Sequence, residues 1–330
     1  MTTGPVPTGA VPTGALTTGP VPTGAVTSAS RSGPVPRTDG LLLVVALAAV
    51  STSGPLIAAT AVPALAIAFW RNALAGAVLV PVVLLRRRAE LRGLDRRERR
   101  LALFAGVLLA LHFAVWIPSL RYTSVASATA LVATQPVWAA LLVRLRGQHV
   151  SAAVWTGIGV AVSGALLLSA ADLQVSGRAL VGDLMAAAGG AFAAGYMVVG
   201  SEVRRSVSTT TYTALCYATT ALVLLPVCLF GRQSLSGYEA DDWLKLLALT
   251  AGAQLLGHSL FNTVLRSVSP TVVSLSILFE IPGAALIAAV FLDQRPPLLA
   301  LPAAALLVVG LALVIRAGDG VPERDGAGTG

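Results

Sequence analysis

A few polar residues that could do chemistry stand alone in long apolar runs of this 330-residue chain. Glu280 is the carboxylate of one such run, residues 269–293, and it lies ten residues past Pro270. At about 1.5 Å per helical residue, that is roughly 15 Å into a hydrocarbon core about 30 Å thick. A carboxylate at that depth normally faces a bundle interior or a wet cavity and marks a functional site. The alternative is a structural carboxyl, held neutral or bonded to a neighbouring helix.

Two further runs carry histidine at helical spacing. His112 and Trp116 are four residues apart, as are His258 and Asn262, so each pair shares one face of a helix. Histidine titrates near neutral pH, so both could carry protons. The other role open to them is that of an interior hydrogen-bond donor.

Two prolines stand beside polar residues at matching places. Gln135 precedes Pro136, and Glu280 lies two residues before Pro282. Proline interrupts the helical hydrogen-bond ladder, which is tolerated where the freed carbonyl lines a cavity or packs against protein. We therefore expect both places to border a shared polar site near the membrane midplane.

Arg71 is the basic residue of the second apolar run and lies about eight residues, or roughly 12 Å, past an expected turn near Pro63. It could bind a carboxylate or phosphate of a substrate. It could equally extend to the outer interface or pair with a carbonyl. Tyr196 is a further cavity candidate.

Several familiar chemistries have no motif in this sequence. It contains no Walker A sequence for ATP, no G-x-S-x-G elbow, and no cysteine–histidine set typical of zinc. Cys216 and Cys228 are about 18 Å apart along one helix, too far for a disulfide. We therefore expect no metal and no cofactor.

The composition is that of an integral membrane protein. Hydrophobic residues make up 55% and charged residues 12%, with a mean hydropathy of +0.80, whereas soluble domains are about a quarter charged. Segments of this length cross a bilayer as helices, since the backbone finds no water there. The ten predicted spans are 41–61, 65–85, 101–120, 123–143, 152–170, 181–201, 211–230, 244–264, 270–292 and 298–316.

Both ends of the chain differ from this core. Residues 1–40 contain TTGPVPTGAV twice, at 2–11 and 17–26, and no aromatic residue. Such a segment predicts a disordered tail, and it lacks the pattern of a signal peptide. Residues 317–330 are expected to form a second disordered tail.

Basic residues predict the orientation. With the N-terminus inside, 17 arginines fall in the inner segments, and four arginines and one lysine in the outer loops. This ratio favours both termini in the cytoplasm. The net charge of +8 thus reflects topology and lipid head groups, and no nucleic-acid partner is expected.

The chain repeats itself after about 146 residues. Five helices separate the copies, and an odd number inverts the second copy, as is common in secondary transporters. The sequence predicts an all-α membrane protein of ten helices in two inverted repeats, 41–170 and 178–316. The pairs 146 positions apart are His112 and His258, Pro136 and Pro282, and Gly164 and Gly310.

Three stretches resemble EamA-type members of the drug/metabolite transporter superfamily. They are AIAFWRNALAGAVLVP (66–81), YTSVASATALVATQPVWAALL (122–142) and LLGHSLFNTVLRSVSPTVVSLSILFEIPGAALIAAVFL (255–292). The family often ends the fourth helix of each repeat with an acid; Asp293 fits, while the first copy has Arg146 followed by Gly-Gln. The resemblance spans about 41–316. It implies export of metabolites or drugs by alternating access through a cavity lined by helices 1–4 and 6–9.

The resemblance carries over one set of site residues: Arg71, His112, Trp116, Gln135, His258, Asn262 and Glu280. We expect a secondary exporter of the inner membrane, not an enzyme, that is a monomer or homodimer, surrounded by lipid and driven by proton exchange at Glu280. The alternatives are an intramembrane metal enzyme using His112, His258 and Glu280, and a non-transporting scaffold or sensor.

Overall fold

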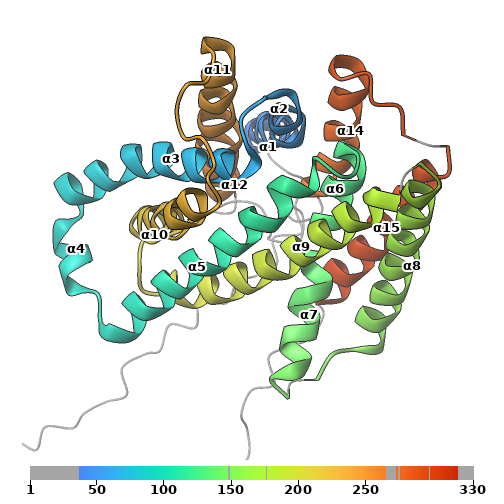
Figure 1. Cartoon of the computed structure of the whole chain (residues 1–330). Helices are drawn as coiled ribbons and strands as arrows, with labels where there is room; N and C mark the ends of the chain where they lie inside the picture. Colours follow the sequence, from blue (N-terminus) through green and yellow to red (C-terminus); the bar gives the residue numbers. More distant parts are fainter. Residues whose placement is uncertain are drawn as a thin grey trace, which may run out of the picture. The chain divides into compact units, whose positions relative to one another are not determined.

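The chain folds into helices that cross and pack on one another (Figure 1). The computed structural model describes residues 37–147, 149–175, 177–264, 273, 276–296 and 298–318, and these ranges hold no strand. The predicted tails lie outside them, apart from residues 37–40 and 317–318, as do most of residues 265–275. The side chains of His258 and Asn262 are also outside the described part, although their backbones lie in a helix.

In the described ranges, nine helical spans are long and apolar enough to cross a membrane, and each overlaps a predicted span. The ninth predicted span, 270–292, is described mainly by the shorter α14 (Glu280–Phe291), and α4 (Arg88–Gly93) connects the second and third spans. The nine are α1 (Arg37–Ser51) with α2 (Ser53–Ala59), α3 (Ala64–Arg86), α5 (Arg96–Ser119), α6 (Val125–Val132) with α7 (Gln135–Leu145), α8 (Ala152–Val175), α9 (Gly177–Val203), α10 (Thr209–Phe230), α11 (Ala240–Ala248) with η1 (Leu249–Gly257) and α12 (His258–Val264), and α15 (Ala300–Gly318).

The fourth and ninth spans are both interrupted by a turn. Between α6 and α7 the chain turns at Ala133 and Thr134, and ahead of α14 it turns at Leu278 and Phe279. The prediction of one continuous helix over 270–292 is therefore wrong. Glu280 is the first residue of α14 and does not lie in the middle of a helix.

The two prolines follow these turns and do not interrupt a helix. Pro136 is the second residue of α7, and Pro282 is the third of α14. The first N–H groups of a helix have no intrahelical acceptor, so a proline there costs no hydrogen bond. This corrects the expectation that each proline frees a carbonyl inside a helix.

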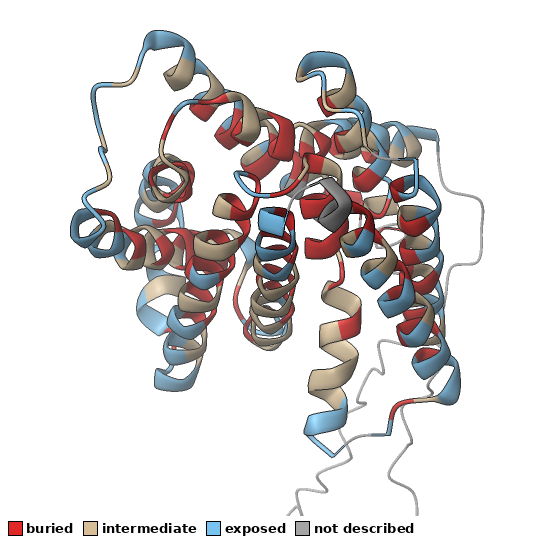
Figure 2. Ribbon diagram, turned by 45° about the vertical axis from the view of Figure 1, so that its right-hand side comes forward, coloured by how far each residue is buried: buried red, intermediate tan, exposed pale blue. Residues whose placement is uncertain are grey.

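Small residues allow close packing of α8 against α15. A Cβ added at Gly164 would lie 2.4 Å from the Leu307 backbone nitrogen, and one at Gly310 would lie 2.2 Å from that of Ala161. Glycine at such contacts is typical of helix pairs in membranes. Figure 2 shows how buried and exposed residues are distributed over the helices, and the exposed ones include large apolar side chains such as Leu166 and Leu301.

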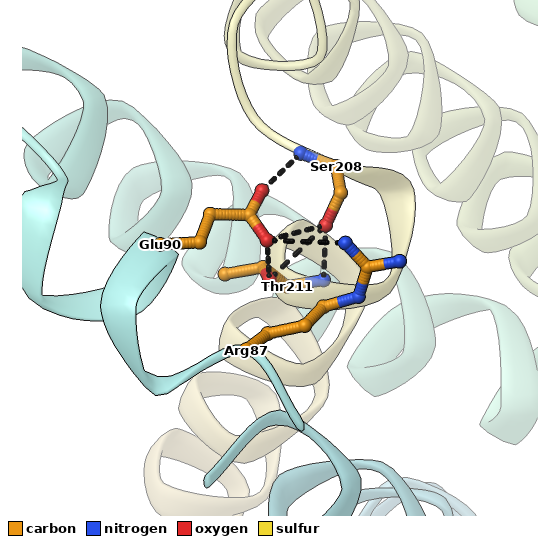
Figure 3. Close-up of polar contacts among 4 residues, drawn as sticks. All are labelled: Arg87, Glu90, Ser208 and Thr211. Atoms are coloured by element: carbon orange, nitrogen blue, oxygen red, sulfur yellow. Dashed lines mark hydrogen bonds and ion pairs between the residues drawn. The ribbon is translucent and has the colours of Figure 1, made fainter. Parts of the chain in front are cut away.

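Polar contacts join segments far apart in sequence at both ends of α3. Beyond its last turn, Glu90 of α4 accepts hydrogen bonds from the backbone nitrogen and hydroxyl of Ser208, at 2.6 and 2.9 Å, and from the Thr211 hydroxyl at 2.8 Å (Figure 3). Ahead of its first turn, the Thr60 hydroxyl donates to Asp242 at 2.6 Å. Each contact connects the first half of the chain to the second.

Candidate functional site

Arg71 lies inside the helix bundle with one edge of its guanidinium unpaired. The residue is 3% exposed, and its Nε donates to Oε1 of Gln254 at 2.6 Å. The guanidinium carbon lies 4.4 Å from the centre of the Phe113 ring. Nη1 has no hydrogen-bond partner among the described residues. Arg71 is thus held by two uncharged groups and does not extend to the interface.

Gln254 connects Arg71 to a directional chain of hydrogen bonds. Its Nε2 donates to Oδ1 of Asn72 at 3.3 Å, and Nδ2 of Asn72 donates to the Ala68 carbonyl at 2.8 Å. Both amides are buried, and an arginine can only donate. The Gln254 oxygen must therefore face Arg71. This determines the donor and the acceptor of each hydrogen bond from Arg71 to Ala68.

Gln254 is not among the residues predicted from the sequence. The residue lies in η1, a stretch of π-helix inside the eighth span. Such wide turns are rare and often occur at functional sites. The available signal was an amide in an apolar run, four residues before His258. No sequence pattern predicted the π-helix itself.

Glu280 lies near this group without contacting Arg71. Its side chain is half-buried, and the opposite charges of Glu280 and Arg71 are close enough to act on one another. The ion pairs at contact distance between described residues do not include this one. The carboxyl group can therefore influence Arg71 and still leave its free edge open.

His112 and Trp116 share a face of α5, as their spacing predicts. Their rings stack with centroids 5.6 Å apart and an interplanar angle of 12°. Nδ1 of His112 lies 2.9 Å from the Gly189 carbonyl, an acceptor, so this nitrogen carries the proton. Phe113 lies against both rings and under Arg71, which joins the aromatic cluster to the guanidinium.

The remaining predicted residues have no hydrogen bond or ring contact with Arg71 among the described side chains, or their side chains are outside the described part of the chain. Gln135 is half-buried at the start of α7. Tyr196 stacks on Tyr212 of α10, with ring centroids 6.0 Å apart. The side chains of His258 and Asn262 fall outside the described residues.

Asp183 is a second buried residue that was not predicted from the sequence, and it is an acid. It lies in α9 with 2% exposure and accepts a hydrogen bond from the Thr123 hydroxyl at 2.8 Å. Its position three residues into a predicted span was the available signal. Within the described ranges, no three histidine, cysteine, aspartate or glutamate side chains gather as a metal ion would require.

Apolar helices long enough to cross a bilayer, with charged and amide groups buried among them, define a polytopic membrane protein. The model of the EamA-like transporter family matches residues 39–170 and again 180–316. The chain therefore belongs to the EamA-like transporter family of the drug/metabolite transporter superfamily. It is a membrane transporter, and such proteins move small molecules in a lipid environment.

The structural comparison agrees with this fold. One similar crystal structure of a protein has a TM-score of 0.59 and 21% sequence identity, and the match covers 84% of this chain and 97% of that one. At this identity the likeness concerns the fold alone. No curated protein matches the sequence.

Proposed function

We propose that this protein is a secondary transporter that exports a small metabolite or drug across the inner membrane by alternating access. The observation that carries the proposal is the buried group of Arg71, Gln254 and Asn72, with Glu280 in electrostatic range. A purely structural bundle has no need of an unpaired guanidinium in its interior, because burying such a charge is costly.

The proposed architecture is two inverted repeats, 41–170 and 178–316, with both termini in the cytoplasm. The excess of arginines on one side supports this orientation. The turns that open α7 and α14 support the repeat, because their first residues, Gln135 and Glu280, are 145 positions apart. Interrupted helices of this kind commonly border the substrate site of inverted-repeat transporters.

In this proposal Glu280 couples transport to protons. When ionised, its charge offsets that of Arg71 across the site. When protonated, it leaves the guanidinium to another acceptor. The net charge of the site thus differs between the protonated and the deprotonated carrier. For His112, the hydrogen bond to Gly189 favours the interior-donor role over that of a proton shuttle.

The test is a comparison of the growth medium of cells that express the intact protein or Glu280→Gln at equal membrane levels. We expect at least one compound to accumulate outside only with the intact protein. Glu239→Gln is the matched control, because Glu239 is an exposed acid outside the apolar spans. If Glu280→Gln exported the same compound at the same rate with the same pH dependence, the coupling role would be wrong.

A further inference from the structure

The buried arginine lacks a negatively charged contact. Among the described residues, Arg71 is the only arginine or lysine that is fully buried. Its hydrogen-bond acceptor is the neutral amide of Gln254, and its ring neighbour is Phe113. A buried charge is stable only when it is paired and its hydrogen-bonding capacity is used. Nη1 of Arg71 is left without an acceptor, and the guanidinium has no anion in contact with it.

A second unpaired donor lies in the same cluster. Nε1 of Trp116 is buried and has no acceptor among the described residues. The Trp116 ring packs against Phe113, whose face carries the Arg71 guanidinium. Two buried donors without acceptors, joined through one aromatic ring, call for a ligand that supplies acceptor oxygens next to an apolar body.

We infer that Arg71 selects substrates that carry a carboxylate, which binds the free Nη1 edge of its guanidinium while the aromatic cluster of Phe113 and Trp116 contacts an apolar body. This inference rests on the transport function proposed above and adds the chemical class of the substrate. A planar carboxylate matches the fork of N–H donors on a guanidinium.

A phosphate ester fits this group less well than a carboxylate. A phosphate carries up to two charges and three strong acceptor oxygens, and proteins usually meet it with several cationic groups. Here the described part of the interior offers one guanidinium, that of Arg71. One free cationic edge matches one negative charge.

Gln254 acts as a positioning residue for this contact. Its amide holds Nε of Arg71 without cancelling the positive charge. Gln254→Glu would place an internal carboxylate at the same point, 2.6 Å from Nε in the intact protein. Such a carboxylate would satisfy Arg71 from within and compete with a carboxylate ligand.

Binding is measured on the full-length protein in lipid nanodiscs by thermal unfolding. The probes are 3-phenylpropionate and its neutral amide, 3-phenylpropionamide, each at about 10 mM. We expect the carboxylate to raise the Tm of the intact protein by about 2 °C or more, and the amide to leave it unchanged. Arg71→Gln and Gln254→Glu should both remove the shift, whereas Arg146→Gln, at an exposed arginine, should keep it.

Gln254→Glu serves to distinguish loss of binding from a folding defect, which Arg71→Gln alone could not do. Arg71→Gln removes a buried side chain, but Gln254→Glu retains Arg71 and gives it a paired charge, so this variant should fold with an unchanged or higher Tm without probe. A Tm shift with the amide equal to that with the carboxylate, no shift with either probe, or a shift retained in Gln254→Glu would overturn the inference.

The medium comparison separates this inference from the proposed function. An exported compound that lacks any acidic group, or one whose export survives Arg71→Gln, would overturn the carboxylate inference and leave transport standing. Binding of 3-phenylpropionate by a protein that exports nothing would contradict the transport proposal and support the site.

Discussion

The guanidinium of Arg71 is surrounded by groups that hold it in place and do not neutralise it. Gln254 provides an amide oxygen, Phe113 provides the face of a ring, and Glu280 stays out of contact. Each of these partners is weaker than a carboxylate in direct contact would be. The arrangement therefore keeps a charge available inside the membrane, at a cost in stability that a bound substrate would reduce.

At the residue scale, Gln254→Leu should destabilise the protein more than Gln254→Glu. Leucine leaves Nε of Arg71 and Oδ1 of Asn72 without their partner, and each unsatisfied buried group costs about 1–3 kcal/mol. Glutamate keeps an acceptor for Arg71. Thermal unfolding in nanodiscs measures the difference. Equal Tm values for the two variants would show that the hydrogen-bond chain does not contribute to stability.

Glu90 gives a second prediction at this scale, one that depends on pH. Partial burial acts to raise the pKa of Glu90, but hydrogen bonds from the Ser208 backbone, Thr211, the Ser208 hydroxyl and Arg87 outweigh it, so the pKa lies below its usual 4.5. A lowered folded-state pKa stabilises the protein above the unfolded-state value, and this stabilisation is lost as pH falls through the folded-state pKa.

The stability of the intact protein should therefore decline below about pH 4.5 more steeply than that of Glu90→Gln. The measurement is the Tm of both proteins in nanodiscs from neutral pH to about pH 3.5. Glu239→Gln, which alters an exposed acid without a side-chain cap, should decline like the intact protein. Parallel curves for Glu90→Gln and the intact protein would show that these hydrogen bonds contribute no pH-dependent stability.

At the scale of elements, the close pairing of α8 and α15 depends on glycine at the contact. Gly310→Ala would place a Cβ 2.2 Å from the Ala161 nitrogen, which is backbone and cannot turn away. Overpacking of this kind typically costs about 1–3 kcal/mol. Gly159→Ala on α8 is the matched control, because nothing lies within 4 Å of its added Cβ.

We expect Gly310→Ala to lower the Tm and Gly159→Ala to leave it unchanged or raise it slightly, since alanine favours helix more than glycine does. Both variants are compared with the intact protein in the same lipid. If the two alanine variants were equally stable, the close approach of α8 and α15 would not be a feature of the folded protein in the membrane.

Sequence predicts some parts of these elements well and others poorly, for physical reasons. The apolar spans follow from the need to satisfy the backbone without water, so composition alone locates them. The stacking of His112 on Trp116 follows from four-residue spacing. The turn before Glu280 and the π-helix around Gln254 do not follow from spacing. Both elements contact the first span, far away in sequence, where a Cβ added at Gly257 would meet Val50 and one at Gly283 would meet Ser51.

At the scale of the whole molecule, the contacts at the two ends of α3 have a shared consequence. Glu90 joins α4 to the start of α10 at one end, and Thr60 bonds Asp242 at the other. Both contacts connect the first half of the chain to the second. Alternating access, as proposed, requires the two halves to separate first at one end and then at the other.

A cross-link at one end should therefore stop transport. In the double variant Glu90→Cys and Ser208→Cys, a short bifunctional reagent that forms a disulfide with each thiol would join α4 to the start of α10, where the carboxylate now accepts from Ser208. Cys216 and Cys228 are both buried, which shields them from the reagent.

Export of the compound found in the medium comparison should fall to background after cross-linking and return after reduction. The two single-cysteine variants, treated in the same way, should keep their export. Full export by completely cross-linked protein would mean that this end stays closed throughout the cycle, and that the substrate leaves and enters by separations elsewhere in the bundle.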